Sequence, residues 1–109
     1  MSVETEVLWL DDHRLVSLRE LIEFSGLHEA ELLELVHSGV LPARDLPGQG
    51  YYFSARVVTL ARTACRLRDD LELDTPAVGV ALKLLERMHD LEQEITRLRA
   101  QLPHAQPPR

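Results

Sequence analysis

The side chains best suited to catalysis or metal binding are the five histidines and the single cysteine. A metal site needs several ligands that converge on one point. His28 and His37 lie nine positions apart, which is about two and a half helical turns, so they point to opposite faces of a helix. Cys65 is the only cysteine, which excludes an intrachain disulfide and a cysteine-rich zinc module. We therefore expect no metal ion and no other cofactor.

The sequence also lacks the motifs of common enzymes. It contains no glycine-rich phosphate loop and no nucleophile elbow. Cys65 lies within the apolar-periodic run VVTLARTACRL, where a small core residue is expected rather than a nucleophile. Asp11 and Asp12 are interpreted as a solvated strand end. We assign no catalytic residue and predict that the chain is not an enzyme.

The distribution of carboxylates indicates a binding function. The formal net charge is −6, and residues 1–42 hold nine acids against two arginines. Residues 43–109 are nearly balanced, with ten Lys or Arg against nine acids. A charged partner of the N-terminal half should therefore be basic.

Leu and Val dominate the apolar content and aromatics are few, which favours a helical core over a strand-rich one. Short helices are therefore expected to position these acids. Ser17 is predicted to cap the helix LRELIEFS, and Gly26 to end it. The helix HEAELLELVHS follows and stops at Gly39. Two short helices joined by a tight turn are typical of a helix-turn-helix, although any small helical pair can show this spacing.

The next segments predict a hairpin and a third helix. Turn residues in LPARDLPGQG precede the aromatic run YYF, a pattern that indicates a hairpin wing. Ser54 is predicted to cap the helix SARVVTLARTACRLRDDLEL. The core face of this helix is expected to comprise Val57, Leu60, Ala61, Ala64 and Leu71. Before the first helix, EVLWL predicts a short strand.

A long helix is predicted from Pro76 to about Leu102, because Asp74 and Thr75 before a proline form a strong start signal. Its first half can close the head, but its second half extends past anything a domain of this size can cover. That half carries an apolar seam with three-four spacing: Leu84, Met88, Leu91, Ile95, Leu98 and Leu102. We predict a homodimer through this seam, and packing of a bent helix within one chain is the alternative.

The predicted fold class is all-α with a small β-hairpin wing. We expect a winged-helix-like head over residues 1–75, a long C-terminal dimerisation helix over 76–102 and a disordered tail over 103–109. No apolar run reaches the length of a membrane span, and the N-terminus lacks the features of a signal peptide. We therefore predict a cytoplasmic protein with no membrane partner.

The order of these elements resembles the MerR-type winged helix over roughly residues 14–87. The sequence is most similar to the CbpM chaperone-modulator family. The signature LRxxLxLDxPxxxxAL of that family is matched here by Leu67, Arg68, Leu71, Leu73, Asp74, Pro76, Ala81 and Leu82. The resemblance implies a MerR-like winged helix-turn-helix head that binds the J-domain of a DnaJ-like co-chaperone of the CbpA type and inhibits its co-chaperone activity.

This resemblance suggests a role for the acids of the head. J-domains present a basic helix beside a His-Pro-Asp loop, and an acidic surface can cover it with charge-assisted contacts. An exposed Phe24 or Leu33 would supply an apolar anchor. The expected contact residues are Glu20, Glu23, Phe24, Glu29, Glu31, Leu33, Glu34, Asp69 and Asp70. The alternative is that these glutamates only solvate one helix face.

Two other functions compete with this interpretation. A MerR-like DNA-binding transcriptional regulator would place the second helix in the major groove, but HEAELLELVHS has three glutamates and no Arg or Lys. In the wing, Arg44 is matched by Asp45. DNA binding is therefore disfavoured. A bare dimerisation adaptor would use the seam as its main working surface, and the sequence is compatible with it.

Overall fold

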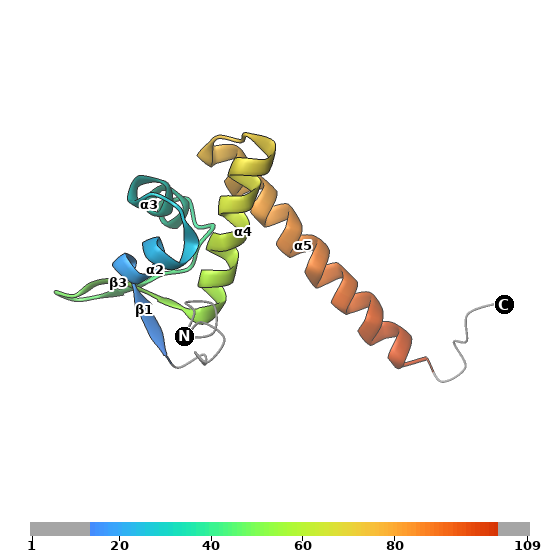
Figure 1. The fold of residues 1–109 in the computed structure, drawn as a ribbon. Coiled ribbons are helices and arrows are strands. Elements are labelled where there is room, and N and C mark those ends of the chain that lie inside the picture. Colours follow the sequence, from blue (N-terminus) through green and yellow to red (C-terminus); the bar gives the residue numbers. More distant parts are fainter. Residues whose placement is uncertain (1–13, 103–109) are drawn as a thin grey trace, which may run out of the picture.

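The computed structural model describes residues 14–102, which form a head and one projecting helix (Figure 1). The elements in chain order are β1 (Leu15–Ser17), α2 (Leu18–Ser25), α3 (Glu29–His37), β2 (Arg44–Leu46), β3 (Gly50–Ser54), α4 (Ala55–Leu71) and α5 (Thr75–Ala100). The four helices and one small sheet of residues 14–102 confirm the predicted fold class. The predictions for EVLWL, for the Asp11–Asp12 pair and for the tail over 103–109 lie outside the described residues.

Local hydrogen bonds set the ends of α2. The Ser17 side chain accepts from the backbone N–H of Glu20 at 3.1 Å, and the Glu20 carboxylate accepts from the backbone N–H of Ser17 at 2.8 Å. This reciprocal capping box satisfies two backbone donors that the first turn leaves free. Gly26 ends the helix with φ of 86°, a left-handed conformation that favours glycine. The predicted limits of α2 are confirmed.

The wing is part of a three-stranded antiparallel sheet with strand order β1-β3-β2. Val16 of β1 pairs with Phe53 of β3, and both side chains are buried. The ring of Tyr51 lies edge-on to that of His37 at the end of α3, with 6.3 Å between the ring centroids. The predicted hairpin is present, but β1 was not predicted because three residues are too few to show strand alternation.

Helix α4 crosses the centre of the head. Val57, Ala61 and Ala64 are buried as predicted. The prediction that Leu71 belongs to the core is wrong, because its side chain is 60% exposed at the last turn of α4, where the chain leaves the head. Ser54 occupies the cap position, but its side chain makes no cap hydrogen bond.

Helix α5 closes the head with its first turns and then leaves it. The Asp74 carboxylate accepts from the backbone N–H of Ala77 at 2.9 Å, which confirms the predicted start. Val78, Gly79 and Leu82 are buried against the head. The helix would be about 39 Å long at 1.5 Å per residue, and the molecule extends 55 Å along its longest axis.

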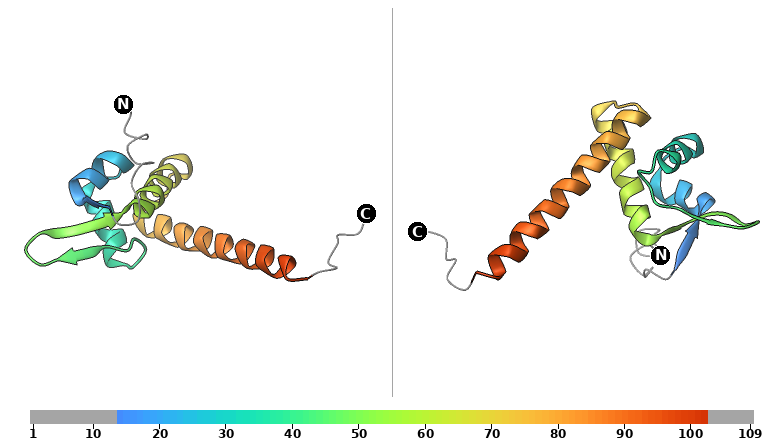
Figure 2. Two further views of the ribbon diagram at one scale, coloured as in Figure 1. Left: turned by 90° about the horizontal axis from the view of Figure 1, so that it is seen from below. Right: turned by 180° about the vertical axis from the view of Figure 1, so that it is seen from behind.

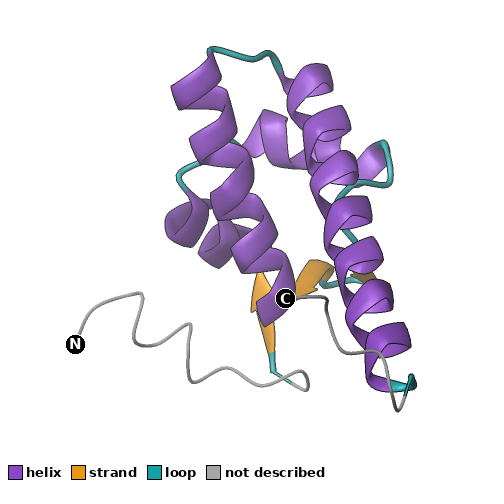
Figure 3. Cartoon of the chain, turned by 90° about the vertical axis from the view of Figure 1, so that its right-hand side faces the viewer, coloured by secondary structure: helices purple, strands orange, loops and turns teal. Residues whose placement is uncertain are grey.

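The views in Figures 2 and 3 show how α4 and α5 are arranged. The two helices are joined by a short loop at one end and diverge from it, and the strands lie at the other end of α4. Within residues 14–102, no helix is long and apolar enough to cross a membrane.

Replacing Leu82 by alanine should destabilise the protein, because this side chain is 1% exposed where α5 closes the head. We expect the free energy of unfolding to fall by about 2–5 kcal/mol in urea denaturation. Leu71→Ala is the matched control, and it should change the value by less than about 0.5 kcal/mol because Leu71 is exposed. Equal losses in the two variants would show that α5 does not close the core.

Candidate functional site

The exposed acids of the head do not form one patch. Glu23 of α2 and Glu29 of α3 lie together at a groove of about 380 Å³, whose other lining residues are Leu18, Arg19 and Ile22. Leu18 and Ile22 are half-buried, whereas Glu23 and Glu29 are exposed. Neither carboxylate makes a hydrogen bond or an ion pair with the rest of the described chain. We call these five residues the acidic groove.

The other predicted carboxylates have different surroundings. Glu34 is exposed on another edge of α3, in a depression that also contains Lys83 of α5. Asp70 is exposed on α4 beside Arg66 and Leu71. Glu20 is engaged in the capping box of α2. The fold therefore brings only Glu23 and Glu29 of the predicted acids to one groove.

The predicted apolar anchors are less accessible than expected. Phe24 and Leu33 are half-buried rather than exposed, and Phe24 packs against the core. The carbonyl of Phe24 also accepts from Nε of Arg62 at 2.9 Å. Leu18 and Ile22 are the apolar side chains that adjoin the exposed acids. They share a helical face at i and i+4, a spacing that could have indicated them in the sequence.

Arg68 holds α3 against α4 through its guanidinium. Its Nη1 lies 2.6 Å from Oε1 of Glu31, and its Nε lies 2.9 Å from Oδ1 of Asp69. Oε1 of Glu31 also accepts from the backbone N–H of His28 at 2.9 Å. The Arg68 and Glu31 side chains are only 22% and 20% exposed. Two of the predicted partner contacts, Glu31 and Asp69, thus have a structural role in the head.

The surroundings of Arg68 also shift the pKa values of nearby titratable groups. The hydrogen bond from Arg68 lowers the pKa of Asp69, and the same bond raises the pKa of Arg68. Burial raises the pKa of the Cys65 thiol, so the thiol remains protonated at neutral pH and is a poor nucleophile. Over residues 14–102, no group of three or more His, Cys, Asp or Glu side chains could hold a metal ion.

The seam on α5 is the second candidate surface. Its six side chains are between 45% and 60% exposed, and every residue from 87 to 102 is exposed. The alternative of a bent helix that packs within one chain is therefore wrong for the described residues. An exposed apolar stripe of this length is typical of a protein-binding surface.

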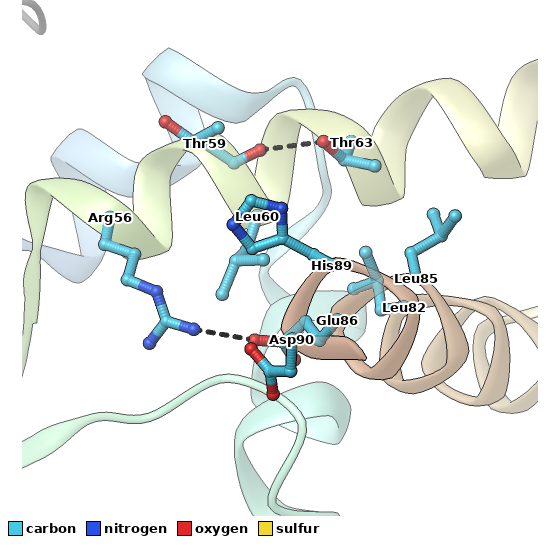
Figure 4. Close-up of a pocket in the computed structure, with 9 residues that line it drawn as sticks. All are labelled: Arg56, Thr59, Leu60, Thr63, Leu82, Leu85, Glu86, His89 and Asp90. Atoms are coloured by element: carbon cyan, nitrogen blue, oxygen red, sulfur yellow. Dashed lines mark hydrogen bonds and ion pairs between the residues drawn. The ribbon is translucent and has the colours of Figure 1, made fainter. Parts of the chain in front are cut away.

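A third hollow lies between α4 and α5 (Figure 4). In Figure 1, the projecting part of α5 lies on the side of α4 away from α2 and α3. Its volume is about 450 Å³, and Leu60, Leu82 and Leu85 supply its apolar lining. Arg56 and Glu86 are paired at 2.9 Å at its rim. The remaining polar lining consists of Thr59, Thr63, His89 and Asp90, and these groups do not form a catalytic arrangement.

Comparison with known proteins adds to this geometry. A family model described as MerR HTH family regulatory protein matches residues 16–100. Chaperone modulatory protein CbpM of Escherichia coli O139:H28 is 34% identical over 86 residues, which are 79% of this chain and 85% of that protein. The CbpM proteins of E. coli K12 strain DH10B and of Shigella boydii serotype 18 match with the same identity and coverage. Neither the family nor these relatives is described as an enzyme.

Removing the Arg68 guanidinium should loosen the contact between α3 and α4. Arg68→Leu leaves the half-buried Glu31 carboxylate without its cation, and we expect the free energy of unfolding to fall by about 1–3 kcal/mol. The matched control is Arg66→Leu, since Arg66 is exposed on the same helix and makes no ion pair within the described chain. Adding Glu31→Gln to Arg68→Leu should recover part of the loss, because glutamine keeps the cap and removes the charge. Equal urea midpoints for the two leucine variants would contradict the role of Arg68.

Proposed function

This chain belongs to the family of the chaperone modulatory protein CbpM, which has a MerR-type head, and we propose that it is a chaperone modulator that binds a J-domain. The partner is the J-domain of a DnaJ-like co-chaperone of the CbpA type, and binding inhibits its co-chaperone activity. The proposed protein is a cytoplasmic homodimer that pairs through the seam. The acidic groove of the head is the proposed J-domain site.

The observation that carries the proposal is the pairing of free carboxylates with apolar surface in the acidic groove. Glu23 and Glu29 are exposed and make no ion pair within the described chain. The half-buried Leu18 and Ile22 line the same groove, together with the exposed Arg19. A basic amphipathic helix suits such a groove, because its cations meet the carboxylates and its apolar residues cover the leucine and the isoleucine. J-domains present a basic helix of this kind.

The proposed inhibition of the co-chaperone follows because the head covers the basic helix of the J-domain. A J-domain whose basic helix is covered by the head cannot present the same surface to its DnaK-type partner. The carboxylates of Glu23 and Glu29 would mainly increase the association rate and the specificity, because they lie at the exposed rim. Most of the affinity would come from apolar contacts with Leu18 and Ile22.

The description of the family model as a regulatory protein with a helix-turn-helix supports DNA binding as a second candidate. The surface of α3 counts against it. Glu29 and Glu34 are exposed on this helix, and no Lys or Arg lies on it. Carboxylates near phosphates repel them, whereas DNA-binding helices and wings need cations. Arg44 and Asp45 in the wing are both exposed and offset each other in charge.

Reversing the charges of the acidic groove tests the proposed site. The double variant Glu23→Lys and Glu29→Lys should weaken binding to the J-domain by about tenfold or more in calorimetry, because the lysines repel the basic helix. The matched control is Asp45→Lys with Asp90→Lys, which makes the same charge change at exposed positions outside the groove.

The control variant should bind with nearly the affinity of the wild type. Equal weakening in both variants would show that only the net charge matters. Unchanged binding in the groove variant would reject the acidic groove as the site and favour an adaptor that works through the seam.

A further inference from the structure

The hollow between α4 and α5 has an apolar floor that is open to solvent (Figure 4). Leu82 is buried at this floor, Leu60 is half-buried and Leu85 is 42% exposed. The volume of about 450 Å³ falls within the range of roughly 300–1,000 Å³ that is typical of pockets with a bound ligand. The hollow can therefore accept a large apolar side chain.

The described chain begins beside one end of this hollow. Leu15 of β1 pairs with Ser54 of β3, and Ser54 directly precedes α4. Arg56, in the first turn of α4, lines the hollow. Figure 1 shows the start of β1 near the start of α4, at the end away from the loop that joins α4 to α5. The residues that precede Arg14 are therefore joined to the fold next to the hollow.

The sequence before Arg14 contains one apolar run. Residues 7–10 read VLWL and include Trp9, the only tryptophan of the chain. Asp11 and Asp12 follow this run. A tryptophan side chain buries roughly 150–250 Å² when it is covered, and covering it against leucines is favourable because apolar surface leaves water. The run and the hollow floor are thus complementary in chemistry.

The connecting chain is long enough to bring them together. Trp9 lies five residues before Arg14, and an extended chain of this length spans about 17 Å at about 3.3 Å per residue. Leu60 lies six residues after Ser54, which is about 9 Å along α4 at about 1.5 Å per residue. The indole can therefore reach the leucines of the hollow from the start of β1.

The charge at the near end of the hollow also suits this segment. The Arg56 side chain is 66% exposed, and its Nη2 donates to Glu86 at 2.9 Å. A guanidinium carries five N–H donors, so Arg56 can bind a second carboxylate at the same time. A chain that runs from residue 14 to Leu60 passes Arg56, and it brings Asp11 and Asp12 to that side chain.

We propose that the occupant of the hollow between α4 and α5 is this chain's own segment at residues 7–10, with the indole of Trp9 against Leu60 and Leu85. The two aspartates that follow the segment then lie beside Arg56. The segment joins α4 to the projecting part of α5 and braces the angle between the two helices. This role is independent of the partner that the head binds.

The outer edge of β1 is a poorer site for the same segment. Strand β1 has only three residues, and β3 already pairs with its other edge. The backbone N–H of Ser17 donates to the Glu20 carboxylate at 2.8 Å, so it cannot pair with an added strand. A strand added there would therefore form few backbone hydrogen bonds.

Trp9 reports its own surroundings, because the chain has no other tryptophan. In the full-length wild type, its fluorescence should lie at shorter wavelength than that of free tryptophan, and acrylamide should quench it several-fold less. Leu85→Asp should remove both effects, because it places a carboxylate in the hollow. Leu71→Asp is the matched control, since Leu71 is exposed on α4 outside the hollow, and it should behave like the wild type. Wild-type emission like that of free tryptophan, or equal effects of the two variants, would overturn the proposal.

Methyl resonances locate the indole, because an aromatic ring shifts the signals of methyl groups that pack against it. Trp9→Ala should move the methyl signals of Leu60 and Leu85 and leave those of Leu71 in place. Movement of the Val16 signals instead would place the segment on β1 and overturn the proposal. Circular dichroism should show the same helix content in every variant.

Mixed samples test whether the segment and the hollow belong to the same chain. Isotope-labelled Trp9→Ala protein is unfolded and refolded together with an excess of unlabelled wild type. The labelled Leu60 and Leu85 signals should stay at the positions of the variant, because the labelled chain lacks its own indole. Their return to the wild-type positions would show that the segment of a second copy fills the hollow, and it would overturn the proposal.

Discussion

Helix α5 lies close to α3 because position 79 carries no side chain. A Cβ atom at Gly79 would lie 3.3 Å from Cγ2 of Val40 and 3.4 Å from Cδ2 of Leu35, closer than most real Cβ contacts. Because α5 lies this close to α3, Val78 and Leu82 are buried in the core. Beyond this contact, the six side chains of the seam are between 45% and 60% exposed. The close contact at Gly79 thus joins the first turns of α5 to the head.

Several residues of the family signature have structural roles around that contact, whereas Leu71 is exposed. Arg68 joins α4 to Glu31 at the start of α3, and Asp74 caps α5. Leu67 and Leu73 pack against the core, and Leu82 is buried within it. The signature therefore accounts for how α3, α4 and α5 are held together. The proposed contacts with a J-domain lie outside it, in the acidic groove between α2 and α3.

Much of the fold could be predicted because the ends of its helices carry strong local signals. The caps at Ser17 and Asp74 and the left-handed Gly26 are properties of a few adjacent residues. The site was harder to predict, since burial and pairing depend on contacts between distant segments. Glu31 lies 37 positions from Arg68, and no local pattern shows that its carboxylate is already occupied. Leu71 follows the helical period of α4 yet lies beyond the elements that would cover it.

We propose that electrostatic attraction between the acidic head of this protein and a basic J-domain helix directs their association. The most direct test is a calorimetric titration of this protein with the J-domain of its own organism's CbpA-type co-chaperone, at low and at high salt. We expect saturable binding that weakens as salt rises, because screening reduces interactions between exposed charges. The absence of binding at low salt, or an affinity that salt does not change, would contradict it.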